Sequence, residues 1–140
     1  MNGRFFLDTN VFVYSFDRSA PAKARRALEL IRSAVATRKG ITSYQVVQEF
    51  FNVALRRFAN PMTVADAEQY LLTIFRPLVA IHSSPALYGE ALRIFDRYRL
   101  SWYDSLIVAA AIEGECDVLY SEDLNSGQKF DKLTIANPFF

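Results

Sequence analysis

Short β-prone runs alternate with longer helix-forming segments along the chain, and this alternation restricts the fold more than any other feature. The clearest runs lie at 4–7, 40–42, 78–81, 118–120 and 133–135. Strands that alternate with helices pair in parallel, because each helix returns the chain to the starting edge of the sheet. The sequence therefore predicts an α/β fold: a three-layer α/β/α sandwich around a central, mainly parallel sheet of four to five strands.

Capping residues and prolines set the predicted helix boundaries. Serine close before proline predicts the first turns of helices over 21–38 and 85–99. A third helix is predicted over 44–59. A near capping box, a threonine followed three residues later by an aspartate, begins a fourth over 63–75, which Pro77 is expected to stop.

Length and composition limit the class of protein. A chain of 140 residues with 51% hydrophobic residues can bury a core of its own, so residues 1–140 are expected to form a single domain. Acidic residues interrupt the N-terminal apolar run, and no run approaches the roughly 20 apolar residues of a membrane span. We therefore expect a cytoplasmic protein without membrane association. The single cysteine, Cys116, excludes an internal disulfide, and the lone His82 cannot assemble a histidine metal site.

Charge and aromatic content bear on partners. A net charge of +1 is too small to predict nucleic-acid binding from bulk electrostatics. Arginines cluster on several predicted helices, and each cluster is interpreted first as a solvated helix face. Twelve phenylalanines and seven tyrosines in so short a chain favour a protein partner or a homodimer surface, although a thick core also uses such side chains.

Two acidic segments follow strand-like runs directly. The apolar run at 4–7 ends at Asp8, which is expected to begin a loop, and the run at 118–120 is followed by Ser121, Glu122 and Asp123. The carboxyl ends of parallel strands meet at one edge of a sheet, where α/β proteins bind their ligands. Each segment also has a plain structural interpretation, because acidic residues are common in turns and helix caps.

Two further acids lie on predicted helices. Asp104 precedes the run 106–112, which has no polar face and must be buried. With Ser101 as the N-cap, Asp104 lies in the first turn, where the helix dipole favours negative charge, but a buried charge is costly unless a cation compensates it. Both interpretations stay open for Asp104. Glu49 lies one to two turns along its helix, which places it about 9 Å from the helix start at a rise of about 1.5 Å per residue. This position permits Glu49 to meet the other acids, but a solvated surface glutamate is the alternative interpretation.

Together Asp8, Glu49, Asp104 and Asp123 predict a divalent metal site. Without a cation four close carboxylates would repel one another, and Mg²⁺ prefers oxygen ligands of this kind. Hydrolysis of a phosphodiester needs a nucleophilic water, charge neutralisation at the phosphate and help for the leaving oxygen, all of which bound metal supplies. We expect Asp8, Asp104 and Asp123 to bind the ion directly or through water. Glu49 is expected to position the attacking water or a second ion.

A resemblance to a known family rests on four segments in order: FFLDTNVFVY, QEFFN, WYDSLIVAAA, and LYSEDLNSGQ followed by NPF. These segments resemble the PIN-domain ribonucleases, specifically the VapC-type toxins of bacterial toxin–antitoxin pairs. The resemblance spans nearly the full length of the chain. It implies a PIN-like fold, a Mg²⁺- or Mn²⁺-dependent endoribonuclease that cleaves RNA, a homodimer, and a small antitoxin protein that blocks the site.

The resemblance also assigns residues. The family's first three acids fall on Asp8, Glu49 and Asp104, and all three are present. Its hydroxyl–any–Asp pattern places the fourth acid at Asp123, with Glu122 as the substitute. The hydroxyls of Thr9 and Ser121 are candidate supporting groups that orient their neighbours.

Three rival functions are weighed against this one. A phosphotransferase of the haloacid-dehalogenase kind needs a second aspartate two positions after the first, where this chain has Asn10. A receiver-like domain needs paired acids near the first strand and a lysine after a late strand, and neither pattern is present. The remaining alternative is a non-catalytic RNA- or protein-binding PIN-like module, which the presence of all four acids disfavours.

Overall fold

The computed structural model describes residues 2–139. Strand and helix alternate along this part of the chain as the sequence predicts. The elements are β1 (Phe5–Leu7), α1 (Thr9–Tyr14), α2 (Pro21–Thr37), β2 (Gly40–Ser43), α3 (Tyr44–Ala54), α4 (Val64–Tyr70), the π-helical turn η1 (Leu71–Phe75), α5 (Arg76–Leu78), β3 (Val79–Ile81), α6 (Pro85–Tyr98), α7 (Trp102–Glu113), β4 (Val118–Tyr120), β5 (Lys129–Phe130) and β6 (Leu133–Ala136).

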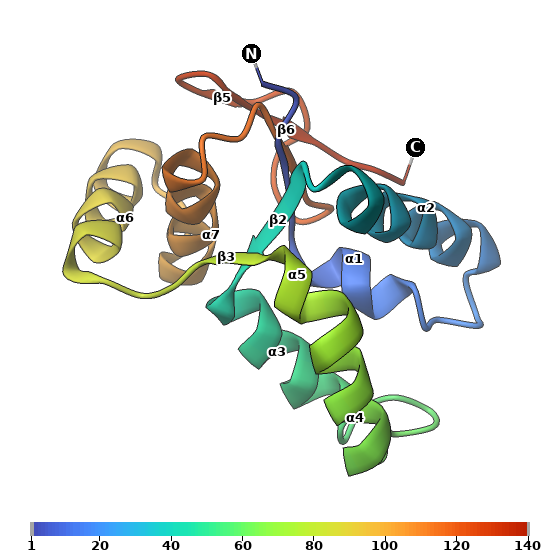
Figure 1. The fold of residues 1–140 in the computed structure, drawn as a ribbon. Coiled ribbons are helices and arrows are strands. Elements are labelled where there is room, and N and C mark those ends of the chain that lie inside the picture. Colours follow the sequence, from blue (N-terminus) through green and yellow to red (C-terminus); the bar gives the residue numbers. More distant parts are fainter. Residues whose placement is uncertain (1, 140) are drawn as a thin grey trace.

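The described strands form one sheet in the order β3-β2-β1-β4-β6-β5. All neighbouring strands are parallel except the β5–β6 pair, which is an antiparallel hairpin. Helices α6 and α7 lie on one side of the sheet and α1 and α2 on the other, while α3 and α4 extend from its lower end (Figure 1). This arrangement confirms the predicted three-layer α/β/α sandwich with a mainly parallel sheet.

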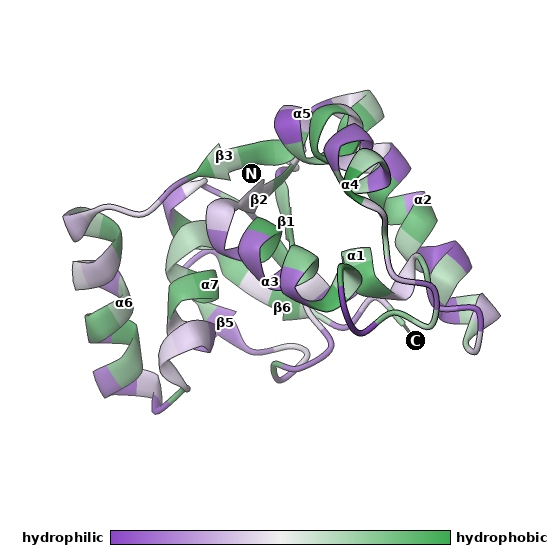
Figure 2. Ribbon diagram, turned by 90° about the horizontal axis from the view of Figure 1, so that it is seen from below, coloured by the Kyte–Doolittle hydropathy of each residue, from purple (hydrophilic) through white to green (hydrophobic). Residues whose placement is uncertain are grey.

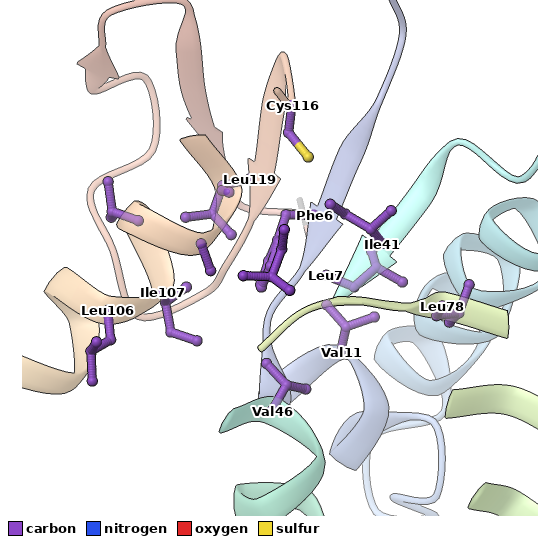
Figure 3. Close-up of a cluster of buried hydrophobic side chains, with 14 of the residues drawn as sticks. Phe6, Leu7, Val11, Ile41, Val46, Leu78, Leu106, Ile107, Cys116 and Leu119 are labelled. Atoms are coloured by element: carbon purple, nitrogen blue, oxygen red, sulfur yellow. The ribbon is translucent and has the colours of Figure 1, made fainter. Parts of the chain in front are cut away.

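The core lies on both faces of the central strands. Phe6 of β1 pairs in register with Ile41 and Leu119, so these fully or largely buried side chains share one face. Figure 3 shows Phe6 and Leu119 close together on the side of α7, where Ile107 is also buried. Because strand side chains alternate, Leu7 faces the opposite layer. Every residue of β2 is buried, as expected of a strand covered on both faces.

Helix α7 confirms the prediction that a helix without a polar face must be buried. Residues 105–111 are all buried, and α6 packs on the side of α7 that faces away from the sheet. The hydropathy colouring of Figure 2 shows α7 as mostly hydrophobic and the outer helix α6 as mixed. None of the helices within residues 2–139 is long and apolar enough to cross a bilayer.

Helix caps follow the sequence at three of four predicted starts. The side chains of Thr63, Ser84 and Ser101 accept backbone N–H bonds of 3.1, 3.0 and 3.1 Å from residues three positions later. The exception is α2, whose N-cap is Ala20, while Ser19 instead binds the carboxylate of Asp17. The helix still begins at a proline, as predicted.

Four local predictions are wrong. The sheet of the described chain has six strands, because the two-residue β5 is too short to leave a pattern. Asp8 does not begin a loop but caps α1 directly. Helix α3 ends at Ala54, not at residue 59, because the Ala54 carbonyl accepts the N–H of Met62. Pro77 does not stop the fourth helix: the chain widens into the π-helical turn and Pro77 occupies the first turn of α5, where a missing N–H is tolerated.

Candidate active site

The site lies where the strand order reverses. β1 has β2 and β3 on one side and β4, β6 and β5 on the other, and such a switch point is where α/β sheets open a crevice beyond their strand ends. Leu7 and Tyr120 are register partners at the ends of β1 and β4. The residues that follow them, Asp8 and Ser121, therefore meet at this edge, and the Asp8 N–H donates to the Tyr120 carbonyl at 3.1 Å.

Asp8 is the most buried of the four acids, with 6% of its surface exposed. Its Oδ1 accepts the backbone N–H of Thr9 at 2.7 Å, which caps α1, and its Oδ2 accepts the hydroxyl of Ser121 at 2.7 Å. Burial raises the pKa of the Asp8 carboxyl from 3.8 to about 6; the two hydrogen bonds oppose this rise, while the charges of Glu49 and Asp123 add to it. Asp8 thus caps helix α1 and is also a buried carboxyl whose ionisation is disfavoured by its surroundings.

Glu49 is hydrogen-bonded to Thr9, the first residue of α1. The hydroxyl of Thr9 donates to Glu49 Oε1 at 2.6 Å, and the amide of Gln45 donates to Glu49 Oε2 at 3.2 Å. The side chain is half-buried in the second turn of α3, so it is not a freely solvated surface glutamate. Gln45 was not predicted from the sequence; its signal is its position four residues before Glu49, which places both on one face of the helix.

Asp104 lies in the first turn of α7, half-buried, with its backbone N–H bound to the Ser101 hydroxyl. Burial raises the pKa of the Asp104 carboxyl, a hydrogen bond from Ser101 lowers it, and the charges of Asp123 and Glu49 raise it further. The structural and functional interpretations of Asp104 are therefore compatible, because the residue lies in a capped first turn and its carboxyl is also affected by the charges of Asp123 and Glu49.

The two candidates for the fourth acid are engaged differently. Asp123 is exposed, and its Oδ2 accepts a long hydrogen bond of 3.3 Å from the Asn10 amide. Glu122 accepts hydrogen bonds from Lys23 at 2.6 Å and from the Tyr14 hydroxyl at 2.7 Å. The Lys23 ammonium, followed by the Tyr14 hydrogen bond, lowers the pKa of the Glu122 carboxyl. Glu122 is thus paired with a lysine of α2 and a tyrosine of α1, whereas the contact of Asp123 is the neutral side-chain amide of Asn10.

The four acids affect one another electrostatically but do not enclose an ion as they stand. The charges of Glu49 and Asp123 raise the pKa values of both Asp8 and Asp104. Within residues 2–139, no three His, Cys, Asp or Glu side chains are grouped closely enough to hold a metal on their own. The donor set nevertheless fits a hard divalent cation, because it consists of oxygens and such ions complete their coordination with water.

Asn10 contributes a side-chain carbonyl oxygen to the site, which was not predicted from the sequence. Its Oδ1 is shielded from solvent and has no hydrogen-bond partner within the described chain, while its Nδ2 contacts Asp123. Buried polar atoms nearly always have partners, so an unpaired carbonyl beside a cluster of carboxylates is consistent with a missing cation or its water. The available signal was its place two residues after Asp8.

Two solved structures have folds similar to that of the chain. The chain is similar to a chain of a toxin–antitoxin complex from Klebsiella pneumoniae, with 16% identity, a TM-score of 0.68, and coverage of 96% of this chain and 97% of that one. It is also similar to VapC20 of Mycobacterium tuberculosis, described as a sarcin–ricin loop cleaving toxin, with 22% identity, a TM-score of 0.62, and coverage of 85% and 89%. These likenesses show a shared fold. No curated protein matches the chain at a comparable level of significance.

The sequence itself matches a family. The model of the PIN domain aligns with residues 5–133, which include all four acids and both hydroxyl residues of the candidate site. A match over most of the 140 residues, together with a sheet and switch point of the expected kind, identifies the family. The chain belongs to the PIN domain family.

Proposed function

We propose that the chain is a metal-dependent endoribonuclease that acts as the toxin of a toxin–antitoxin pair. The observation that carries this proposal is Asp8, a buried carboxylate at the switch point of the sheet whose pKa is raised by burial and by two neighbouring acids. Membership of the PIN family supports it, as do two structural neighbours described as a toxin–antitoxin complex and an RNA-cleaving toxin.

The roles follow from the contacts of each side chain. Asp8, Asp104 and Asp123 would hold the ion directly or through water, because none of these carboxylates forms an ion pair with a Lys or Arg of the described chain. Bound Mg²⁺ or Mn²⁺ supplies charge neutralisation at the phosphate and activates a water molecule. Glu49, held by the Thr9 hydroxyl at 2.6 Å, orients the attacking water. Ser121 fixes the Asp8 carboxylate at 2.7 Å, and Glu122 supports the loop through Lys23 rather than binding metal.

The partners belong to the same proposal. RNA is the substrate, a cognate antitoxin covers the site, and the chain forms a homodimer. Exposed apolar side chains support protein contacts: Phe16, Leu55, Leu71 and Leu72, near the ends of α1, α3 and α4.

A cleavage assay tests the proposal. The purified chain is incubated with mixed RNA in Mg²⁺ or Mn²⁺, with chelator as the control, and Asp8→Asn is compared with Asp96→Asn, which alters an exposed acid on α6. We expect metal-dependent cleavage by the wild type and by Asp96→Asn, and none by Asp8→Asn. RNA binding without cleavage at any metal concentration would favour the non-catalytic module instead.

A further inference from the structure

A pocket of about 380 Å³ opens beside the acid cluster, on the side of α6 and α7. Its walls come from the end of β2 with the first turns of α3, from the segment after β3, and from α6 and α7. The aromatic residues that line it are Tyr88, Trp102 and Tyr103, and the polar ones include Ser43, Gln45, Gln48 and His82. None of the acids of the candidate site belongs to this lining.

One polar group of this pocket has no partner from the chain. Ser43 is the N-cap residue of α3 and is 4% exposed, yet its hydroxyl makes no capping bond. Its Oγ has no hydrogen-bond partner among the described residues. A serine at an N-cap ordinarily binds the backbone of the first turn, and a buried hydroxyl is rarely left unpaired. The hydroxyl of Ser43 therefore has unused hydrogen-bonding capacity, in a residue that lines the pocket.

The chemistry of the lining suits a flat, uncharged, hydrogen-bonding group. The rings of Tyr88 and Trp102 lie 6.2 Å apart and are tilted by 52°, so they form two walls and not a closed stack. None of the described residues that line the pocket is Lys, Arg, Asp or Glu, which disfavours a phosphate or a metal ion. Unstacked nucleobases bind proteins through aromatic faces and through hydrogen bonds to their edges, and the side-chain amide of Gln48 adds donors and an acceptor.

A hydrogen-bonded bridge connects the pocket to the acids. The amide of Gln45 donates both to Glu49 Oε2 at 3.2 Å and to the Tyr103 carbonyl at 3.3 Å. Gln45 and Tyr103 line the pocket, and Glu49 belongs to the acid cluster. A strand whose phosphate lay at the acids would thus have a neighbouring base within reach of the pocket.

We propose that this pocket receives one unstacked nucleobase of the RNA, from a nucleotide adjacent to the phosphate held at the acid cluster. The inference rests on the proposed function, and it makes the pocket a determinant of base selectivity. Tyr88 and Trp102 provide the aromatic surface on which one face of the base packs, while Ser43 and Gln48 bind its edge.

The single tryptophan of the chain, Trp102, reports on pocket occupancy directly. In Mn²⁺, the Glu49→Gln variant, which keeps the three proposed metal ligands but lacks the carboxylate that orients the attacking water, is titrated with a single-stranded RNA hexamer and with a hexamer of equal length and charge that lacks all bases. We expect a saturable change in Trp102 fluorescence with the base-bearing RNA and little or none with the abasic one. An equal response to both hexamers, or no response to either, would overturn the proposal.

Matched variants separate the pocket from the surrounding surface. Tyr88 and Phe95 lie on α6 and are 43% and 44% exposed, but only Tyr88 lines the pocket. Tyr88→Ala should weaken RNA binding roughly tenfold, as loss of one stacking platform does, and Phe95→Ala should leave it unchanged. Ser43→Ala should weaken binding about threefold without loss of stability, because the hydroxyl it removes is unpaired. Equal effects of Tyr88→Ala and Phe95→Ala would overturn the assignment.

A cleavage assay in Mn²⁺ keeps this inference distinct from the proposed function. Base-dependent fluorescence without cleavage would refute the nuclease and leave the base-binding pocket intact. Cleavage that is indifferent to every base flanking the cut, combined with no fluorescence response, would refute the pocket and leave the nuclease intact.

Discussion

The hydroxyl of Ser121 donates a 2.7 Å hydrogen bond to Asp8 Oδ2, joining two residues that are 113 positions apart in sequence. Each residue directly follows a strand, and the two strands are parallel neighbours at the point where the sheet order reverses. The bond holds one oxygen of a buried carboxylate, and the backbone N–H of Thr9 holds the other. Both oxygens of the Asp8 carboxylate are thereby held by groups of the chain itself.

Burying the Asp8 carboxylate lowers the free energy of unfolding at neutral pH, and the substitution Asp8→Asn should remove this loss. Burial raises the pKa of Asp8 from 3.8 to about 6, so the folded state binds a proton more tightly than the unfolded state. The free energy of unfolding therefore falls as pH rises from about 4 to above 6. Because each pKa unit corresponds to about 1.4 kcal/mol, the total loss is on the order of 3 kcal/mol. Asparagine can accept from Thr9 and donate to Ser121. Asp8→Asn should thus be more stable than wild type at pH 7 by about 1–3 kcal/mol.

Urea unfolding in chelator at several pH values checks this prediction. The stability difference between Asp8→Asn and wild type should fall steadily below pH 6 and vanish only well below the unfolded-state pKa of 3.8, where Asp8 is protonated in both states. The comparison isolates Asp8 because the other shifted groups are common to both proteins. A variant that is less stable than wild type at pH 7 would contradict the assigned burial cost.

Thr9 provides a test of how Glu49 is held. Thr9→Val keeps the shape of the side chain but removes the hydroxyl that donates to Glu49 Oε1 at 2.6 Å. We expect cleavage to fall about 10- to 100-fold, the range expected for a misplaced catalytic group, and Thr9→Ser to restore most of it. Thr73→Val, which removes a hydroxyl bound to the Gln69 carbonyl on an exposed helix face, is the control. Equal losses in the Thr9 and Thr73 variants would exclude a positioning role.

The sequence predicts the layers of this fold better than the details of its site. Strand ends are visible as apolar runs closed by acids, so the placement of Asp8 and Asp123 at one edge follows from parallel pairing alone. The contacts of Glu49 with Thr9 and Gln45 depend on how α3 leaves β2, which no local pattern encodes. The end of α3 was mispredicted for the same reason, because the Ala54 carbonyl is taken by Met62 from a later loop.

The fourth acid shows a further limit of sequence reasoning. Glu122 and Asp123 are adjacent and chemically alike, so spacing cannot separate them. The structure distinguishes them by partners, since Lys23 lies 2.6 Å from Glu122 and Asn10 lies 3.3 Å from Asp123. The pocket beside α7 was equally invisible, because its residues come from four separated segments.

These partners predict opposite effects for two neighbouring substitutions. Asp123→Asn should abolish or strongly reduce cleavage and change stability little, because its carboxylate is exposed. Glu122→Gln should keep cleavage but lower stability by up to about 1 kcal/mol, since the Lys23 and Glu122 side chains are 38% and 25% exposed and solvent screens the pair. Cleavage rates and thermal unfolding of both variants provide the measurement. Loss of cleavage in Glu122→Gln with retention in Asp123→Asn would reverse the assignment.

Addition of Mn²⁺ should stabilise the wild type in a way that depends on pH. A ligand that binds only the native state raises stability, by about 2.7 kcal/mol when its concentration is 100 times its dissociation constant. The pKa values of Asp8 and Asp104 are raised, so a cation must displace protons from these carboxyls at acidic pH and binds more weakly there. The rise in Tm on adding Mn²⁺ should therefore be larger at pH 7.5 than at pH 5.5. Asp8→Asn and Asp104→Asn should show little rise in Tm at either pH, whereas the control Asp96→Asn should behave as wild type. A rise in Tm of the same size in all four proteins would mean that the ion binds elsewhere.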